Sequence, residues 1–260
     1  MFKLGNDNMR MESTPERVYA LCKYLMKNPS TIDRLRNELT LYDIFGEKSD
    51  NEIKLTLEAA MELNLVVLEE GIYKVSDNAG ALDSVESFRK YAAKTALSGA
   101  DTLFFKTTSM YLRLAETISE NRSWSSIAAY LTKMGLNVTE NDMLGWRFWA
   151  SFLGVGYLHG TFVIPNCSRR IEDVLENCDQ FGSNSPVPVA VFFQWLEAEC
   201  PELKGSREDN KIGLAVSNAL RTLETKDRIG LVLQPDAPKW LLYTLESEQL
   251  NEISHVRIKR

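Results

Sequence analysis

Apolar side chains recur at helical spacing three times in the first part of the chain, and two short apolar runs follow them. Residues 15–28, 30–39 and 50–63 each place apolar positions three or four residues apart, which predicts three helices with one buried side. Residues 65–68 and 72–75 surround a glycine-containing turn and predict the two strands of a hairpin.

Capping residues indicate where two of these helices begin. Thr14 is a plausible N-cap, Pro15 suits the first helical position, and Glu16 completes a capping box with Ser13. Residues 49–52 form a second capping box before the third helix.

The same order of helices and hairpin recurs twice along the chain. In the second instance we expect helices at residues 103–118, 125–133 and 143–153, the last capped by residues 139–142, and strands at residues 155–158 and 161–164 around His159-Gly160. In the third we expect helices at residues 187–199, 201–209 and 210–224 and strands at residues 229–233 and 240–245. A further helical segment, residues 82–97, joins the first two instances.

Three helices followed by a two-stranded hairpin is the element order of the winged-helix superfamily, which this chain resembles most clearly over residues 13–77. We therefore expect a mostly α fold with short β-hairpins (α+β), built from tandem winged-helix units joined by a helical linker. The expected divisions are winged helix 1 (1–80), helical linker (81–121), winged helix 2 (122–166), connector (167–184) and winged helix 3 with a basic tail (185–260).

The resemblance implies two kinds of function. Winged-helix proteins include transcription regulators, and also subunits that use the fold only to bind proteins. Tandem units with acidic surfaces are also similar to accessory subunits of prokaryotic chromosome-maintenance ATPases, including those in plasmid- and phage-defence systems.

The net charge of −6, from 30 Lys+Arg and 36 Asp+Glu, is unevenly distributed, and the first unit (residues 1–80) and residues 167–260 both carry an acidic excess. The third helix of the first unit, the one that enters the major groove in DNA-binding winged helices, contains four carboxylates and one lysine. The hairpin tip adds Glu69 and Glu70. Such a surface repels the phosphate backbone, so we expect the first unit to bind protein, with Glu58 and Glu62 as candidate contacts.

The second unit has one base, Arg147, in its third helix, together with Trp146 and Trp149. Aromatic residues three apart are more often part of the core than of a binding site. A subunit interface is the alternative, so both tryptophans are candidate partner-binding residues.

The third unit tolerates DNA best, because residues 204–228 carry six bases and four acids. Lys211, Asn218 and Arg221 are spaced to lie near one face of a helix, where Asn and Arg can hydrogen-bond base edges. An ordinary solvated helix face is the alternative. The other candidate DNA contacts are Arg207, Lys239 on the wing, and Arg257, Lys259 and Arg260 in a basic tail. The alternative for this tail is a frayed, solvated terminus without a function.

Catalytic motifs are missing from the sequence. There are two histidines, four cysteines without a C-x-x-C pair and no P-loop lysine, so we expect no enzyme activity, no metal site and no cofactor. No apolar run is long enough for a membrane span and no secretory segment precedes the first helix, so we expect a cytoplasmic protein with reduced thiols.

These observations favour a non-enzymatic accessory or scaffold subunit of a prokaryotic complex that acts on DNA, an anti-phage defence complex being one option. In this hypothesis the first two units bind partner proteins, an ATPase among the options, and the third unit contacts double-stranded DNA. The alternative is a free-standing winged-helix transcriptional regulator.

Overall fold

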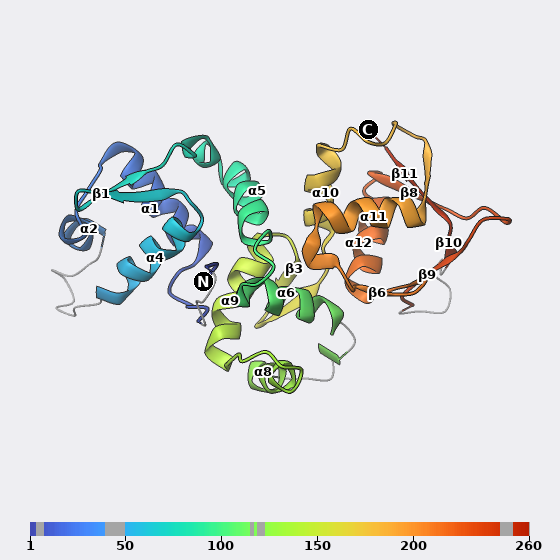
Figure 1. The fold of residues 1–260 in the computed structure, drawn as a ribbon, viewed down its shortest axis with the longest axis horizontal. Coiled ribbons are helices and arrows are strands. Elements are labelled where there is room, and N and C mark those ends of the chain that lie inside the picture. Colours follow the sequence, from blue (N-terminus) through green and yellow to red (C-terminus); the bar gives the residue numbers. More distant parts are fainter. Residues whose placement is uncertain (4–7, 40–49, 115–116, 119–122, 245–251, 260) are drawn as a thin grey trace.

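The computed structural model describes residues 1–3, 8–39, 50–114, 117–118, 123–244 and 252–259. They form a mostly helical chain with small sheets and short hairpins, which confirms the predicted α+β class. Figure 1 shows the first unit at one end of the long axis, the third at the other end and the second between them. None of the helices in these ranges is long and apolar enough to cross a membrane.

The first unit has the predicted order of elements. Its helices are α1 (Pro15–Lys27), α2 (Ile32–Leu39) and α4 (Asp50–Glu62), and its strands are β1 (Val66–Glu69) and β2 (Ile72–Val75). The Thr14 side chain accepts a hydrogen bond from the backbone N–H of Arg17, which confirms the N-cap. Ser30, between α1 and α2, exchanges two backbone hydrogen bonds with Tyr73 of β2. The second predicted capping box contains Ser49, which lies outside the described residues.

The linker and second unit also follow the expected order. The elements are η1 (Ala79–Leu82), α5 (Val85–Ala96), α6 (Leu103–Arg113), α8 (Trp124–Lys133), α9 (Glu140–Phe152), β3 (Gly156–His159) and β4 (Phe162–Pro165). The cap predicted before α9 is confirmed as a capping box between Thr139 and Asp142. The hairpin turn is Gly160-Thr161, one residue later than predicted, because His159 pairs with Phe162.

The third unit departs from the expected order. Its elements are α10 (Ser168–Glu176), β5 (Pro186–Pro188), α11 (Val189–Glu199), η2 (Pro201–Leu203), β6 (Arg207–Glu208), β7 (Lys211–Ile212), α12 (Leu214–Thr225), β8 (Ile229–Val232), β9 (Trp240–Leu242), β10 (Glu252–Ile253) and β11 (His255–Ile258). Helix α10 occupies part of the predicted connector. Its Ile171 and Leu175, four residues apart, are buried on one side of the helix. This helical spacing was present in the sequence, but the prediction of a connector did not use it.

The middle helix predicted at residues 201–209 is wrong. The chain forms a short 3₁₀ turn and then the β6–β7 hairpin, in which Arg207 pairs with Ile212. Gly205 (φ +81°) and Asp209 (φ +51°) adopt left-handed backbone conformations, which a continuing helix excludes. Because Lys211 and Ile212 belong to a strand, α12 begins later than predicted, after Gly213.

The prediction of a hairpin at residues 229–245 is also wrong. The prediction that the last residues form a basic tail is wrong as well. Strand β8 pairs with β11, the supposed tail, which lies between β5 and β8 in a three-stranded sheet. Strand β9 pairs instead with β10 and, in parallel, with β7. Val256 and Ile258 alternate with the two basic residues and are buried, so hydrophobic burial places this segment inside the sheet.

Residues before α1 cross helix α9 of the second unit. The backbone N–H of Met9 donates to Asp142 Oδ1 (2.8 Å), and Trp149 Nε1 donates to the carbonyl of Ser13 (2.5 Å). The close approach requires Gly145, since a Cβ there would lie 2.2 Å from the Met9 carbonyl oxygen. The Phe2 ring packs edge-on against Trp149, with centroids 4.7 Å apart. Helix α9 is therefore covered by the chain's own N-terminal segment.

One buried ion pair connects the linker to the third unit, and a second lies within that unit. Arg89 of α5 donates two hydrogen bonds to Asp173 of α10, at 2.5 and 2.6 Å, and the two side chains are 7% and 9% exposed. Arg170 of the same helix donates to Glu202 (2.9 Å), whose side chain is fully buried. Burial raises the pKa of Glu202, while the adjacent Arg170 opposes that rise. These pairs hold α10 against α5 on one side and against η2 on the other.

We predict that Gly145→Ala destabilises the protein by about 1–3 kcal/mol, because the added methyl group forces the Met9 backbone away from α9. Chemical unfolding measures the change. Gly80→Ala is the control: a Cβ there meets no atom within 4 Å, and we expect a change within about 0.5 kcal/mol. Equal effects of the two substitutions would contradict the close packing of the N-terminal segment on α9.

Asp173→Asn is expected to cost about 3 kcal/mol of unfolding free energy, because it leaves the buried Arg89 guanidinium without its full countercharge. The matched control is Asp33→Asn, which removes the exposed partner of Arg36 and should change stability by less than about 0.5 kcal/mol. A small effect at Asp173 would show that the pair does not hold α5 to α10.

The pH dependence of stability should show the contribution of Glu86. Hydrogen bonds from Arg89 and then from Arg169 lower the pKa of this carboxyl from 4.5 to about 2. Because the folded-state pKa is depressed, the stabilisation is present above pH 4.5 and is lost as pH falls toward 2. The effect is small, since the side chain is 45% exposed. Unfolding of Glu86→Gln should accordingly be less sensitive to pH between 5 and 2 than that of the unmodified protein.

Candidate ligand pocket and predicted contact residues

The two tryptophans proposed as partner contacts lie in the core. Trp146 and Trp149 are 0% exposed. Trp146 Nε1 donates to Thr108 Oγ1 (2.9 Å), and its ring lies 4.4 Å from that of Tyr111. The prediction that these side chains bind a partner is therefore wrong, because α6 and the N-terminal segment already cover them.

The two glutamates predicted to bind a partner differ in their surroundings. Glu62 Oε2 accepts hydrogen bonds from the Met1 ammonium and the Phe2 N–H, both at 2.7 Å, and its side chain is 9% exposed. The prediction that Glu62 contacts a partner is thus wrong, since its carboxylate is already hydrogen-bonded within the chain. Glu58 is exposed on α4, and its role stays a prediction.

The helical face predicted to contact DNA does not form. Lys211 lies on strand β7, whereas Asn218 and Arg221 are half-buried on α12. Helix α12 packs against α10, and the Asn166 side chain after β4 donates to Thr222 Oγ1 of α12 (3.1 Å). Burial lowers the pKa of Arg221. The prediction that all three side chains lie on a single surface is therefore wrong.

Most of the other predicted DNA contacts are engaged inside the third unit. Arg207 Nε donates to Glu197 (2.7 Å), and its guanidinium lies over the Trp240 ring. Ion pairs join Lys239 to Glu252 (3.2 Å) and Lys259 to Asp227 (2.5 Å). Arg257 is half-buried on β11 between Pro186 and Gly230, and Arg260 lies outside the described residues. DNA contact by these residues stays a prediction.

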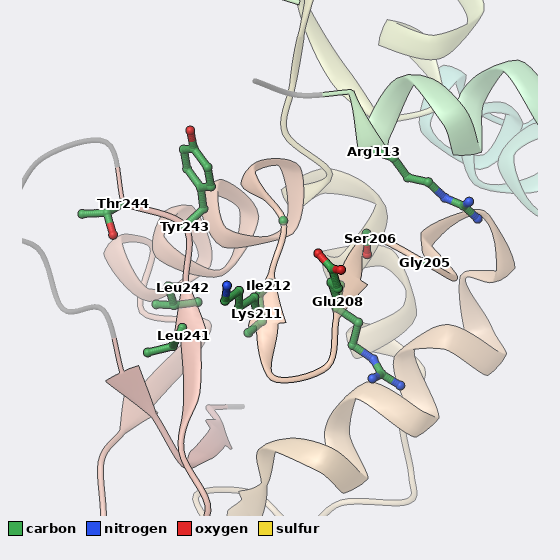
Figure 2. Close-up of a pocket in the computed structure, with 12 residues that line it drawn as sticks. Arg113, Gly205, Ser206, Glu208, Lys211, Ile212, Leu241, Leu242, Tyr243 and Thr244 are labelled. Carbon is green, nitrogen blue, oxygen red and sulfur yellow. The ribbon is translucent and has the colours of Figure 1, made fainter. Parts of the chain in front are cut away.

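Lys211 lies instead in a pocket of about 540 Å³ between the end of α6 and the third unit. Figure 2 shows the lining side chains, which come from the end of α6, the β6–β7 hairpin, β9 and the residues after it. The lining residues are Arg113, Gly205, Ser206, Arg207, Glu208, Lys211, Ile212, Gly213, Leu241, Leu242, Tyr243 and Thr244.

Backbone geometry holds the pocket open. Arg113 donates to the Lys204 carbonyl (2.9 Å), and its guanidinium lies over Gly205, where a Cβ would be 2.7 Å from Cζ. Ser217 Oγ donates to the Ile212 carbonyl (3.1 Å) and accepts from the Tyr243 N–H (2.9 Å), which joins α12 to the chain leaving β9. The parallel pairing of β7 with β9 closes one wall.

Sequence reasoning missed Arg113, because nothing near it in the chain predicts that the end of α6 reaches the third unit. Only long-range packing brings its guanidinium beside the pocket that contains Lys211. Glu208, opposite Lys211 in the hairpin, supplies the one carboxylate among the lining residues. The pocket is therefore lined by three cations, of which Arg207 is paired with Glu197, by one carboxylate and by apolar side chains.

A family model described as DpdG-like matches residues 8–237. The chain belongs to the DpdG-like family. The family is associated with a DNA-modification and phage-defence system, which agrees with the expected link to defence complexes. No curated protein and no solved structure matches the chain significantly. The winged-helix assignment stays a prediction.

The thiols of this DpdG-like chain are not placed for nucleophilic chemistry. All four cysteines are free and buried. Burial raises the pKa of Cys22 to about 12 and raises those of Cys167 and Cys200 as well, so these three are thiols at neutral pH. Within the described ranges, no group of three or more His, Cys, Asp or Glu side chains could hold a metal ion.

Proposed function

We propose that the chain is a non-enzymatic accessory or scaffold subunit of the DNA-modification and phage-defence system with which its family is associated. The observation that carries this proposal is the burial of the helices that a winged helix inserts into the major groove. Helix α9 lies beneath residues 9–13, and α12 packs against α10. Neither helix is available to DNA as the protein is folded.

The exposed hairpins support protein binding. Tyr157 and Ile164 lie directly opposite each other on one face of β3 and β4 and are 47% and 46% exposed, and Leu158 is exposed on the other face. The first hairpin exposes Leu68 and Ile72, on opposite faces of its strands. An exposed apolar pair on one face, such as Tyr157 and Ile164, is typical of protein interfaces. The buried Arg89–Asp173 ion pair between α5 and α10 favours a rigid arrangement of these surfaces, as a scaffold requires.

In the first unit one side of the third helix, α4, is exposed, but its negative charge repels the phosphate backbone of DNA. Glu58 is exposed on α4, and Glu69 and Glu70 lie at the tip of the hairpin. This acidic surface suits a basic protein partner. A free-standing transcriptional regulator, by contrast, needs a basic recognition surface.

DNA contact by the third unit is a secondary part of the proposal. It relies on two exposed lysines, Lys211 on β7 and Lys239 immediately before β9, the strand that pairs with β7, rather than on a recognition helix. Such contacts reach phosphates without base specificity, so binding is weak and falls steeply with salt.

Co-purification tests the scaffold role. The tagged full chain, co-expressed with the other proteins of its defence gene cluster, should capture at least one of them in a stable complex. The double substitution of Tyr157 and Ile164 by Asp should abolish capture, because it charges the exposed face of β3–β4. Val191→Asp, which charges an equally exposed apolar position on α11, is the control and should leave capture intact.

Gel shifts with duplex DNA separate the scaffold from the regulator. We expect weak binding that does not depend on sequence, disappears with added salt and decreases about tenfold in the Lys211→Glu, Lys239→Glu double variant. Sequence-specific binding at nanomolar concentration by the isolated chain, together with failure to capture a partner, would overturn the scaffold role.

A further inference from the structure

The outer face of the β5–β11–β8 sheet carries a row of basic side chains along its central strand, β11. Residues two apart on a strand point to the same face, so His255, Arg257 and Lys259 lie in this row, while Val256 and Ile258 point into the core. Lys259 follows β11 but continues its pairing with the neighbouring strand, because its N–H donates to the Arg228 carbonyl (2.9 Å). Each step along the row is about 6.8 Å, since an antiparallel strand rises about 3.4 Å per residue.

Small and apolar residues border the row on both sides. On this face, the strand residues that the structure describes include no acidic side chain. The neighbours of the row are Pro186 and Pro188 on β5 and Gly230 and Val232 on β8. Both prolines are exposed to solvent, so an apolar surface lies beside the cations.

Gly230 allows two of the basic side chains to lie close together. A Cβ at this position would be 3.5 Å from Lys259 Cε and 3.8 Å from Arg257 Cβ, so both side chains run beside the glycine. Because glycine has no side chain to separate them, the sheet presents an arginine and a lysine next to each other.

The charge of this pair is only partly neutralised. Among the described residues no acidic side chain pairs with Arg257, whose Nε is buried without a hydrogen-bond partner. Lys259 pairs with Asp227 (2.5 Å), but the aspartate is 81% exposed, and ion pairs of such exposed groups are weak. The face therefore carries a positive charge in a chain whose net charge is −6.

Phosphate groups match this arrangement. A guanidinium donates paired hydrogen bonds to phosphate oxygens, and an adjacent ammonium supplies a second positive charge. The linear row suits successive phosphates of an extended nucleic-acid strand, and the exposed prolines give its bases an apolar surface. A duplex suits a flat sheet less well, because its phosphates wind around a cylinder and move away from the face.

We propose that the outer face of the β5–β11–β8 sheet binds single-stranded nucleic acid, with successive phosphates on Arg257 and Lys259 and bases against Pro186. This surface needs no recognition helix, so the burial of α9 and α12 does not obstruct it. The site goes beyond the scaffold role. It is also separate from Lys211 and Lys239, the residues of the proposed duplex contact.

Fluorescence anisotropy tests the site, with a labelled oligothymidylate of about 15 nucleotides titrated with the full chain at low salt. The oligonucleotide should bind, and the Arg257→Glu, Lys259→Glu double variant should bind it about tenfold more weakly or worse. The control is Lys54→Glu, Lys133→Glu, which changes the net charge equally at two exposed lysines and should alter binding by less than about twofold. Thermal unfolding of each variant checks that it is folded.

Substitutions of Gly230 test the geometry directly. Gly230→Glu places a carboxylate beside both cations and should weaken binding about tenfold, because the carboxylate repels the phosphates. Gly230→Gln, which has the same size and no charge, should weaken it much less. The same loss in both variants would contradict the phosphate contact.

Salt dependence counts the phosphates that the surface contacts. Each contact to a single strand contributes about −0.7 to the slope of log K against log salt, so the Arg257→Glu, Lys259→Glu variant should flatten the slope by about 1.4. The Lys211→Glu, Lys239→Glu variant should retain single-strand binding. Failure of the duplex contact and failure of this site can therefore be told apart.

Three results would overturn the proposal: no oligothymidylate binding at low salt, equal binding by the Arg257→Glu, Lys259→Glu variant, or equal binding of a blunt duplex through the same two residues. Displacement of the oligonucleotide by polyglutamate as readily as by unlabelled oligothymidylate would also overturn it, and would assign the surface to an acidic protein segment. Comparison with oligouridylate shows whether RNA or DNA is the preferred strand.

Discussion

The position of the third unit depends on one buried contact, the pairing of Arg89 with Asp173. Each group leaves water at a cost of several kcal/mol, and only good geometry with the partner offsets that cost. Two short hydrogen bonds meet this requirement in one relative position of α5 and α10. Because α10 also holds Glu202 through Arg170 and packs against α12, the third unit is positioned by the same helix.

This arrangement determines which surfaces can have a function. Once α10 lies on α12, and the N-terminal segment lies on α9, the two helices that could enter a DNA groove become internal contacts. The remaining exposed features include the hairpins, the acidic α4 and the pocket between α6 and β7. In the proposed function the hairpins and α4 bind partner proteins, in a family associated with DNA modification and phage defence.

Local signals were sufficient in the first two units. Thr14 and Thr139 cap the helices they were expected to cap, and both hairpins form close to their predicted positions, because capping and tight turns involve residues that are near in sequence. They were not sufficient in the third unit. Strand β11 was mistaken for a basic tail, since its alternation of charged and apolar residues has meaning only when β5 and β8 are beside it.

The sequence by itself determined the mostly helical class, the helices and hairpins of the first two units, and the acidic character of α4, because these follow from side chains within a few residues of one another. Tertiary structure decided the rest. It buried Trp146 and Trp149, separated Lys211 from Asn218 and Arg221, and brought Arg113 to the pocket. Each of these results depends on contacts between distant segments, whose free energy comes from burial and ion pairing that no local pattern contains.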